Sequence, residues 1–298
     1  MLLAGVGLLA LYLAALRPHV SAPGSQPSAV SSHPGASHAP RRIVSLAPGA
    51  TEILFALGLG DRLVGVTNAC DYPPEAKKKP RVGLYERPSL EAIVALEPDL
   101  VVAESPFQDE VIVALRGLGV TAMGLCSPDF DAVTDSIRLL GTRTGTQEQA
   151  QSLAGGMQAQ WRRVRRQTAA LPAQAKPAVF VVIGGHPLIT AGPGTFIHEL
   201  IEAAGGRNIA GKGMSGYPLF SPERVAAEKP EVVIVTHESA LTAIPEAWRG
   251  GRVYTPADID PDAFCRPGPR LAEALETLLR LLHPDLCEAR TPCPGPGS

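Results

Sequence analysis

One stretch of the sequence occurs twice and decides the fold. Residues 89–104 read SLEAIVALEPDLVVAE, and residues 221–238 read SPERVAAEKPEVVIVTHE. Both copies begin with Ser-x-Glu and later place a proline and an acid before a valine-rich run. We expect each copy to form a short helix that leads into a buried strand. Ser221 follows Ser89 by 132 residues, which is too long for a solenoid repeat and suits two similar α/β lobes of one molecule.

Each copy carries one acid in the first turn of its predicted helix, Glu91 in the first and Glu223 in the second. Ser89 and Ser221 are the expected N-cap residues, and a carboxylate in the first turn meets the positive end of the helix dipole. Helix capping is a sufficient explanation for either acid alone. The repetition of the acid, once in each lobe, also suits a partner that presents two matched basic groups.

The composition is that of a globular protein with irregular ends. The chain has 298 residues, 45% of them hydrophobic, and a net charge of −2, so it can bury a large core and is not a polyelectrolyte. Nucleic acid is therefore not an expected partner. Prolines are frequent in the first 40 residues and in the last dozen, where we expect little regular structure.

The N-terminus predicts export. Residues 2–16 form an apolar run, and residues 17–40 are rich in Ser, Pro, Ala and His. The run has the length of a signal-peptide core and falls short of the roughly 17–25 residues of a spanning helix. No basic residue precedes it and no small-x-small cleavage site is obvious, so residues 1–16 are either a signal peptide or an uncleaved anchor, followed by a disordered linker. In both cases the folded part faces outside the cytoplasm.

Motifs for catalysis and metal binding are absent from the sequence. It contains no GxSxG, no HExxH and no CxxC, so we expect no enzyme, no metal site and no cofactor. Cys287 and Cys293 can pair across a short loop, and the total of five cysteines leaves at least one thiol free. His186 and His237, each after a predicted second-lobe strand, are candidate metal or haem ligands, although histidines there usually have structural partners.

The order of predicted elements gives an α/β fold: two Rossmann-like lobes, each with a central parallel sheet, bridged by one long α-helix. The bridging helix is predicted because residues 146–170 lack proline and place Leu153, Met157, Trp161 and Val164 at helical spacing. About 25 helical residues span roughly 37 Å. The predicted boundaries are 41–145 for the first lobe, 146–171 for the bridging helix, 172–284 for the second lobe and 285–298 for the tail.

Two aromatic residues and one polar loop complete the pattern. Tyr85 precedes the first copy of the repeat by four residues, and Tyr217 precedes the second copy by four. Residues 208–220 and 256–269 are expected to be irregular loops, and the latter carries Asp262 and Arg266. A cleft between two such lobes is the natural place for a ligand.

These segments together resemble a known family. RIVSLAPGATEILFALG at residues 42–58, DYPP at 71–74, the two repeat copies and the long helix are similar in order to the periplasmic vitamin B12-binding proteins of bacterial ABC importers. Those proteins belong to the helical-backbone, class III substrate-binding proteins, and the resemblance covers about residues 41–283. It implies capture of a small molecule in the cleft, delivery to a membrane permease dimer, little hinge motion and a monomeric receptor.

The resemblance also implies roles for particular residues. Glu91 and Glu223 are similar to the family's permease-docking acids. Four residues are implied to bind ligand, two at positions of cleft aromatics and two as a polar pair: Tyr85, Tyr217, Asp262 and Arg266.

Several positions depart from the family pattern. The resemblance implies cleft aromatics at four positions that here carry other residues: Ala69, Glu104, Ile183 and Ile189. Position 204 is alanine, so the cysteine of the family's second-lobe disulfide has no counterpart there. Cobalamin, its precursor cobinamide, haem and a ferric siderophore therefore all stay open as ligands. A membrane-tethered scavenger without a permease is a further alternative.

Overall fold

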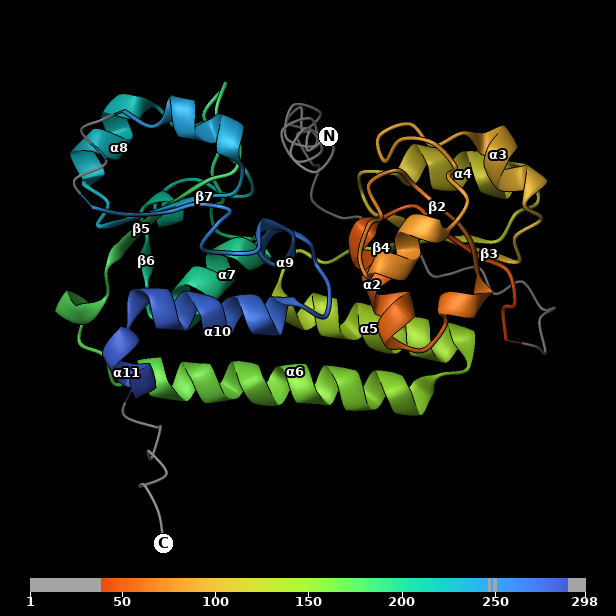
Figure 1. Cartoon of the computed structure of the whole chain (residues 1–298), viewed down its shortest axis with the longest axis horizontal. Coiled ribbons are helices and arrows are strands. Elements are labelled where there is room, and N and C mark those ends of the chain that lie inside the picture. Colours follow the sequence, from red (N-terminus) through yellow and green to blue (C-terminus); the bar gives the residue numbers. More distant parts are fainter. Residues whose placement is uncertain (1–38, 246–247, 249–250, 289–298) are drawn as a thin grey trace, which may run out of the picture.

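The computed structural model describes residues 39–245, 248 and 251–288. Two α/β lobes lie side by side, and helix α6 (Gln147–Thr168) runs beneath both of them (Figure 1). The prediction of a signal peptide or anchor at residues 1–16, most of the linker prediction and Cys293, the predicted partner of Cys287, lie outside the described residues. None of the described helices is both long and apolar enough to cross a membrane.

The first lobe is a parallel four-stranded sheet in the order β2-β1-β3-β4. Its strands are short and almost fully buried, as β-branched runs between two helical layers should be. The strands are β1 (Ile43–Ser45), β2 (Leu63–Val66), β3 (Leu100–Glu104) and β4 (Ala122–Leu125). The α-helices are α2 (Pro48–Ala56), α3 (Leu90–Ala95), α4 (Asp109–Gly117) and α5 (Phe130–Thr144), and short 3₁₀ turns lie at Gly60–Arg62 and Pro74–Lys78.

The second lobe repeats the topology with its own parallel sheet in the order β6-β5-β7-β8. Its strands are β5 (Ala178–Val182), β6 (Arg207–Asn208), β7 (Val232–Val235) and β8 (Arg252–Tyr254). Its α-helices are α7 (Phe196–Ala203), α8 (Pro222–Glu228), α9 (Pro261–Cys265), α10 (Leu271–Leu282) and α11 (Pro284–Glu288), with 3₁₀ turns at Ala173–Ala175, Ile209–Gly211 and Glu238–Ala243. The predicted fold class, two parallel-sheet lobes joined by one long helix, is confirmed.

The sequence repeat is also a repeat of backbone conformation. α3 and α8 are each followed by a residue in the left-handed region, Glu97 with φ of 45° and Lys229 with φ of 47°. Among the described residues, only these two non-glycine residues have positive φ. Left-handed backbone is unfavourable for residues with a Cβ, so its occurrence at matching positions shows that both copies make the same turn into their strands.

The acid that directly follows the proline in each copy, Asp99 or Glu231, has the same structural role in both lobes. Asp99 accepts hydrogen bonds from the backbone N–H groups of Arg41 at 2.7 Å and Arg42 at 2.9 Å, just before β1. Glu231 accepts one from the N–H of Ala178, the first residue of β5, at 3.0 Å. In each lobe the acid therefore satisfies backbone donors at the entrance of a central strand.

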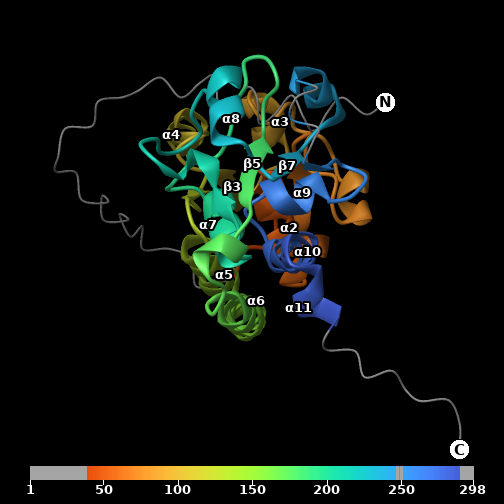
Figure 2. The ribbon, with the colours of Figure 1, turned by 90° about the vertical axis from the view of Figure 1, so that its left-hand side faces the viewer.

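Helix α6 is continuous for 22 residues, close to the predicted length. α5 and α10 pack along it, which is clearest when the helix is seen from its end (Figure 2). Trp161 of α6 stacks on Phe130 of α5, with ring centroids 4.0 Å apart and planes inclined by 12°. Gln160 and Arg163 bind α10 through the carbonyl of Ala272 and the carboxylate of Glu276. The bridging helix is thus held to both lobes by side-chain contacts.

Four short elements lie in or beside segments that the sequence predicted as loops or tail: β6, the 3₁₀ turn Ile209–Gly211, α9 and α11. β6 is a two-residue edge strand inside a glycine-rich segment, too short to produce a periodic pattern. α9 lies in the proline-rich segment, where Asp260 caps the backbone N–H groups of Asp262 and Ala263 and Pro261 occupies the first turn. An aspartate followed by proline is a recognised helix start, so the signal for α9 was present in the sequence.

Two glycines of this scaffold should respond oppositely to alanine. A Cβ on Gly141 of α5 would lie 2.3 Å from the Cβ of Ala150, whereas one on Gly156 of α6 would meet nothing within 4 Å. Gly141→Ala is expected to lower the free energy of unfolding by about 1–3 kcal/mol through overpacking. Gly156→Ala should raise it by about 0.5–1 kcal/mol through helix propensity. Urea unfolding of both variants checks this, and shifts of the same sign would contradict it.

Candidate functional site

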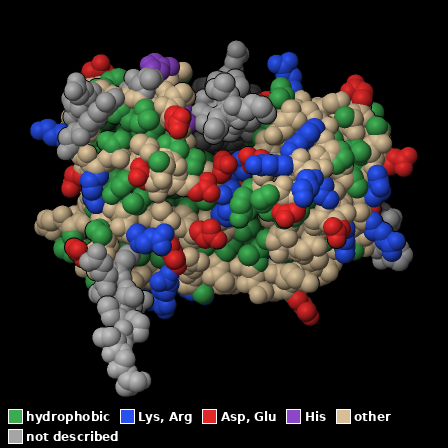
Figure 3. Space-filling view, in the orientation of Figure 1, with side chains coloured by type: hydrophobic (Ala, Val, Ile, Leu, Met, Phe, Trp, Pro, Cys, Tyr) green, Lys and Arg blue, Asp and Glu red, His purple; other side chains and the backbone are tan. Residues whose placement is uncertain are grey.

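The main cleft lies at the seam between the lobes. It encloses about 1010 Å³, a figure that includes solvent at its mouth. Both lobes line it: β3 contributes its last residue, Glu104, and β4 is followed directly by Cys126, while Thr195 and Phe196 come from the start of α7. Acidic and basic side chains gather along this seam (Figure 3). The carboxyl ends of parallel strands are where open α/β sheets usually bind ligands.

Tyr85 and Tyr217 line this one cleft from opposite lobes. Tyr85 is 4% exposed and stacks on Phe107, with ring centroids 4.9 Å apart. Its hydroxyl donates a hydrogen bond to Oε2 of Glu104 at 2.7 Å. Tyr217 is half-buried and follows Gly216, whose φ of 67° turns the loop ahead of α8. The predicted pairing of one aromatic per lobe in a shared cleft is therefore present, and contact with a ligand stays a prediction.

Asp262 and Arg266 also line the cleft, and they form an ion pair across one turn at 2.9 Å. The Arg266 guanidinium in addition contacts Asp71 at 2.8 Å and Glu52 at 3.3 Å, both in the first lobe. Burial opposes the charge of Arg266, yet the three carboxylates more than offset this and raise its pKa. Burial raises the pKa of Asp262 although Arg266 favours its ionised form.

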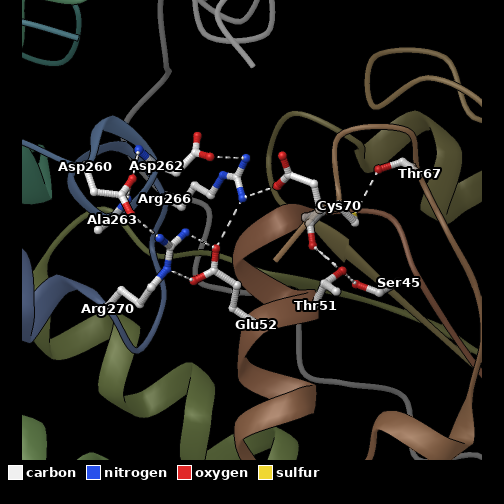
Figure 4. A network of polar contacts seen from close by, with 12 residues as sticks. Ser45, Thr51, Glu52, Thr67, Cys70, Asp260, Asp262, Ala263, Arg266 and Arg270 are labelled. Carbon is white, nitrogen blue, oxygen red and sulfur yellow. Dashed lines mark hydrogen bonds and ion pairs between the residues drawn. The ribbon is translucent and has the colours of Figure 1, made fainter. Parts of the chain in front are cut away.

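A second guanidinium extends these contacts. Arg270 donates from Nη2 and Nε to the two carboxylate oxygens of Glu52, at 2.6 and 2.9 Å, and from Nη1 to Asp260 at 2.6 Å. Its guanidinium also lies over the ring of Tyr72, 4.0 Å from the centroid. We call the resulting cluster the interlobe ion-pair network (Figure 4): Glu52, Asp71, Asp260, Asp262, Arg266 and Arg270. It ties α2 of the first lobe to the segment between β8 and α10.

The cleft also holds two thiols that favour the protonated state. Burial, followed by the nearby acids Asp109, Glu104 and Asp129, raises the pKa of Cys126. Burial raises the pKa of Cys265 to about 12. Because the thiolate is the nucleophile and the metal ligand, neither cysteine is activated for chemistry at neutral pH. In the described part of the chain no group of three or more His, Cys, Asp or Glu side chains could hold a metal ion.

Glu91 and Glu223 lie outside the cleft, in the first turns of α3 and α8. Both are exposed, and both helices lie on the side of their lobes away from α6 (Figure 1). Hydrogen bonds from the residue's own backbone N–H and from the preceding serine lower the pKa of each carboxyl. Ser89 and Ser221 cap the helices as predicted, accepting from N–H groups three residues on at 3.1 and 3.2 Å. The docking role of the two acids stays a prediction.

With this geometry in place, comparison with known proteins identifies the family. Residues 43–248 match the family model described as periplasmic binding protein. The chain belongs to the periplasmic binding protein family. Proteins of this family bind small molecules and work with ABC transporter permeases, so the protein is a transport protein and not an enzyme.

Three relatives illustrate the range of this periplasmic binding protein family. The uncharacterized ABC transporter substrate-binding lipoprotein YvrC of Bacillus subtilis (strain 168) is 30% identical over 259 residues, 83% of this chain and 81% of that protein. The vitamin B12-binding protein of Salmonella choleraesuis (strain SC-B67) is 32% identical over 247 residues, 82% of this chain and 91% of that protein. The apo structure of the periplasmic heme-binding protein RhuT from Roseiflexus sp. RS-1 is 30% identical, with a TM-score of 0.70, and the match covers 82% of this chain and 99% of that one.

The departures from the family pattern fall into two groups. Ala69 and Glu104 line the cleft of this periplasmic binding protein, whereas Ile183 and Ile189 are buried and pack in the core. Ala204 is likewise fully buried in the core. Of these five positions, Ala69 and Glu104 are therefore the ones placed to contact a ligand in the cleft.

The candidate histidines do not line the cleft. His186 is exposed and absent from the lining, and His237 is 6% exposed. The ring nitrogens of His237 lie 2.9 Å from the carbonyl of Ile183 and 2.8 Å from Oγ of Ser239. Burial lowers the pKa of this histidine. Both nitrogens are engaged by the protein, so His237 has the structural role that the sequence left open.

Three important residues of the site were missed at the sequence level: Glu52, Asp71 and Arg270. The available signal was Glu52, a single acid within the apolar helix sequence TEILFALG. A buried acid requires a partner, but the sequence does not identify the arginine 218 positions away that supplies it.

Proposed function

We propose that this protein captures cobalamin or a related corrinoid in the interlobe cleft and delivers it to the permease of an ABC importer. The observation that carries the proposal is one cleft with a tyrosine from each lobe, Tyr85 and Tyr217. Aromatic faces on opposite walls suit a large planar macrocycle, and hydrogen-bonding groups between them suit its polar rim. The name of the Salmonella relative supports the same ligand class.

The charge of the cleft favours a corrinoid over haem. Arg266 is the one basic side chain in the lining as described, and it already contacts three carboxylates. The two propionates of haem need cationic partners, whereas the side-chain amides of a corrinoid are neutral. Haem or a ferric siderophore is the second candidate, because a relative of similar identity is named as heme-binding.

Calorimetric titration of the exported protein with cyanocobalamin, dicyanocobinamide, haemin and a ferric siderophore tests this function. We expect a corrinoid to bind at 1:1 stoichiometry and more tightly than haemin. Tyr217→Ala should weaken corrinoid binding by roughly tenfold or more, equivalent to about 1.4 kcal/mol, because one stacking face is lost. Tyr85→Ala should also weaken corrinoid binding, because it removes a ring from the cleft lining and the hydroxyl that holds the Glu104 carboxyl.

Tyr217→Phe is the matched control, since it keeps the ring and removes only the hydroxyl. It should bind a corrinoid within about threefold of the wild-type protein, which is less than 0.7 kcal/mol. Saturable binding of haemin without any corrinoid binding would exclude the corrinoid assignment in favour of the second candidate. Wild-type affinity in Tyr217→Ala would exclude the role of that ring.

A further inference from the structure

Glu104 occupies a fixed position on the first-lobe wall of the cleft. Its Oε2 accepts the hydrogen bond from the Tyr85 hydroxyl, and its backbone N–H donates to Oε1 of Gln108 at 2.9 Å. Gln108 is 2% exposed and donates in turn to the carbonyl oxygens of Tyr85 at 2.7 Å and Leu46 at 3.2 Å. The carboxyl, the aromatic ring and the end of β3 are therefore held together by one buried amide.

Among the described residues the Glu104 carboxylate has no cationic partner, and burial raises its pKa, an effect that the hydrogen bond from Tyr85 opposes. Asp262, the other acid of the cleft lining, is paired with Arg266, whereas no basic side chain in the described residues forms an ion pair with Glu104. The other charged groups near this wall, Asp109 and Asp129, are acids. A negatively charged group of a ligand would meet repulsion at this place, and a hydrogen-bond donor would be favoured.

One oxygen of the carboxyl remains for a ligand. Oε2 accepts from Tyr85, while no described donor binds Oε1. Glu104 is half-buried. When a ligand displaces water there, a hydrogen bond from a ligand N–H to the carboxyl oxygen becomes more favourable. This position therefore favours a ligand whose rim presents a hydrogen-bond donor.

We propose that Glu104 determines ligand specificity, accepting a hydrogen bond from a carboxamide N–H on the rim of a bound macrocycle and excluding macrocycles that bring a carboxylate to that place. This inference rests on the proposed function, because it assumes a corrinoid in the cleft.

The test uses cyanocobalamin and its three monocarboxylic acids, in each of which one side-chain amide is converted to a carboxylate, titrated at pH 8. The wild-type protein should bind at least one of these acids tenfold or more weaker than cyanocobalamin. Glu104→Gln keeps the shape and an acceptor oxygen but removes the charge, so the ratio should fall below about threefold, less than 0.7 kcal/mol. Glu110→Gln, an exposed acid of α4, is the matched control and should keep the wild-type ratio.

Glu104→Met serves as a second variant, because it removes the acceptor as well as the charge. It should weaken cyanocobalamin itself by roughly tenfold, the value of one hydrogen bond. Circular dichroism and thermal unfolding establish that each variant is folded before titration. Identical ratios in the wild-type protein and Glu104→Gln for all three acids would overturn the inference while leaving corrinoid transport intact.

Failure of the proposed function gives a different result. If the wild-type protein binds no corrinoid, haemin becomes the probe, since it carries two carboxylates. Tighter haemin binding by Glu104→Gln than by the wild-type protein, by tenfold or more, would support the exclusion of carboxylates. No difference between the two proteins, including no binding by either, would overturn it.

Discussion

Glu52→Met is expected to lower the free energy of unfolding by about 3–5 kcal/mol, because it leaves buried guanidinium charge without its main partner. Glu52 is 4% exposed and forms two hydrogen bonds with Arg270 and an ion pair with Arg266. Arg270 would keep only Asp260, and Arg266 would keep Asp71 and Asp262. Chemical unfolding monitored by circular dichroism measures the change.

Asp135→Asn is the matched control for this prediction. Its carboxylate also forms an ion pair with an arginine at 2.8 Å, but the pair with Arg138 is on an exposed helix surface. Such pairs contribute about 0.3–0.5 kcal/mol, so the control should be close to wild type. In the double variant Glu52→Met/Arg270→Met the unpaired charge is removed together with its partner, and part of the lost stability should return. Equal effects of Glu52→Met and Asp135→Asn would show that the network does not stabilise the fold.

Reversal of charge at both docking candidates, Glu91→Arg with Glu223→Arg, is expected to reduce uptake of the ligand by cells more than tenfold. The affinity of the purified protein for the ligand should not change, because neither residue lines the cleft. Both carboxyls are exposed and therefore ionised at neutral pH, and hydrogen bonds at the start of each helix lower their pKa further. Two negative groups on one side of the molecule, one per lobe, suit a permease dimer with two basic sites. Radiolabelled uptake and calorimetry are the two measurements.

The control pair is Glu148→Arg with Glu273→Arg. These acids are also exposed and also lie in the first turn of a helix, but the helices are α6 and α10. The control substitutions therefore make the same change in net charge and at two helix N-termini, but they leave α3 and α8 unchanged. Uptake by this pair should stay near wild type. Normal uptake by the Glu91 and Glu223 double variant would instead favour a tethered scavenger that works without docking through these acids.

The parts of the fold that follow from local patterns could be predicted from the sequence. The repeat at Ser89 and Ser221, the valine-rich strands and the proline-free bridging helix all depend on neighbouring residues, and the structure contains each of them. Tyr85 and Tyr217 were predicted as a pair because they keep the same distance from the two copies. Their common cleft follows from the equal topology of the two lobes.

The interlobe ion-pair network could not be predicted in the same way. Glu52 and Arg270 lie 218 positions apart, and no local pattern records which distant charge a buried acid will meet. The polar pair Asp262 and Arg266 was predicted for ligand binding, and the structure adds that the arginine is shared with Glu52 and Asp71. Glu104 was recognised only as a departure from the family pattern, and its hydrogen bond with Tyr85 gave it a physical role.

The continuity of α6 bears on how a transporter could recognise the ligand-bound receptor. A continuous helix offers no joint at which to bend, and α10 and the ion-pair network join the lobes above it. If the permease docks at Glu91 and Glu223, the distance between these two sites is expected to be the same in the empty and the ligand-bound protein. A transporter that contacts both sites would then have to recognise the loaded receptor by contacting the ligand itself or the loops around it. The distance between the two sites would not report whether a ligand is bound.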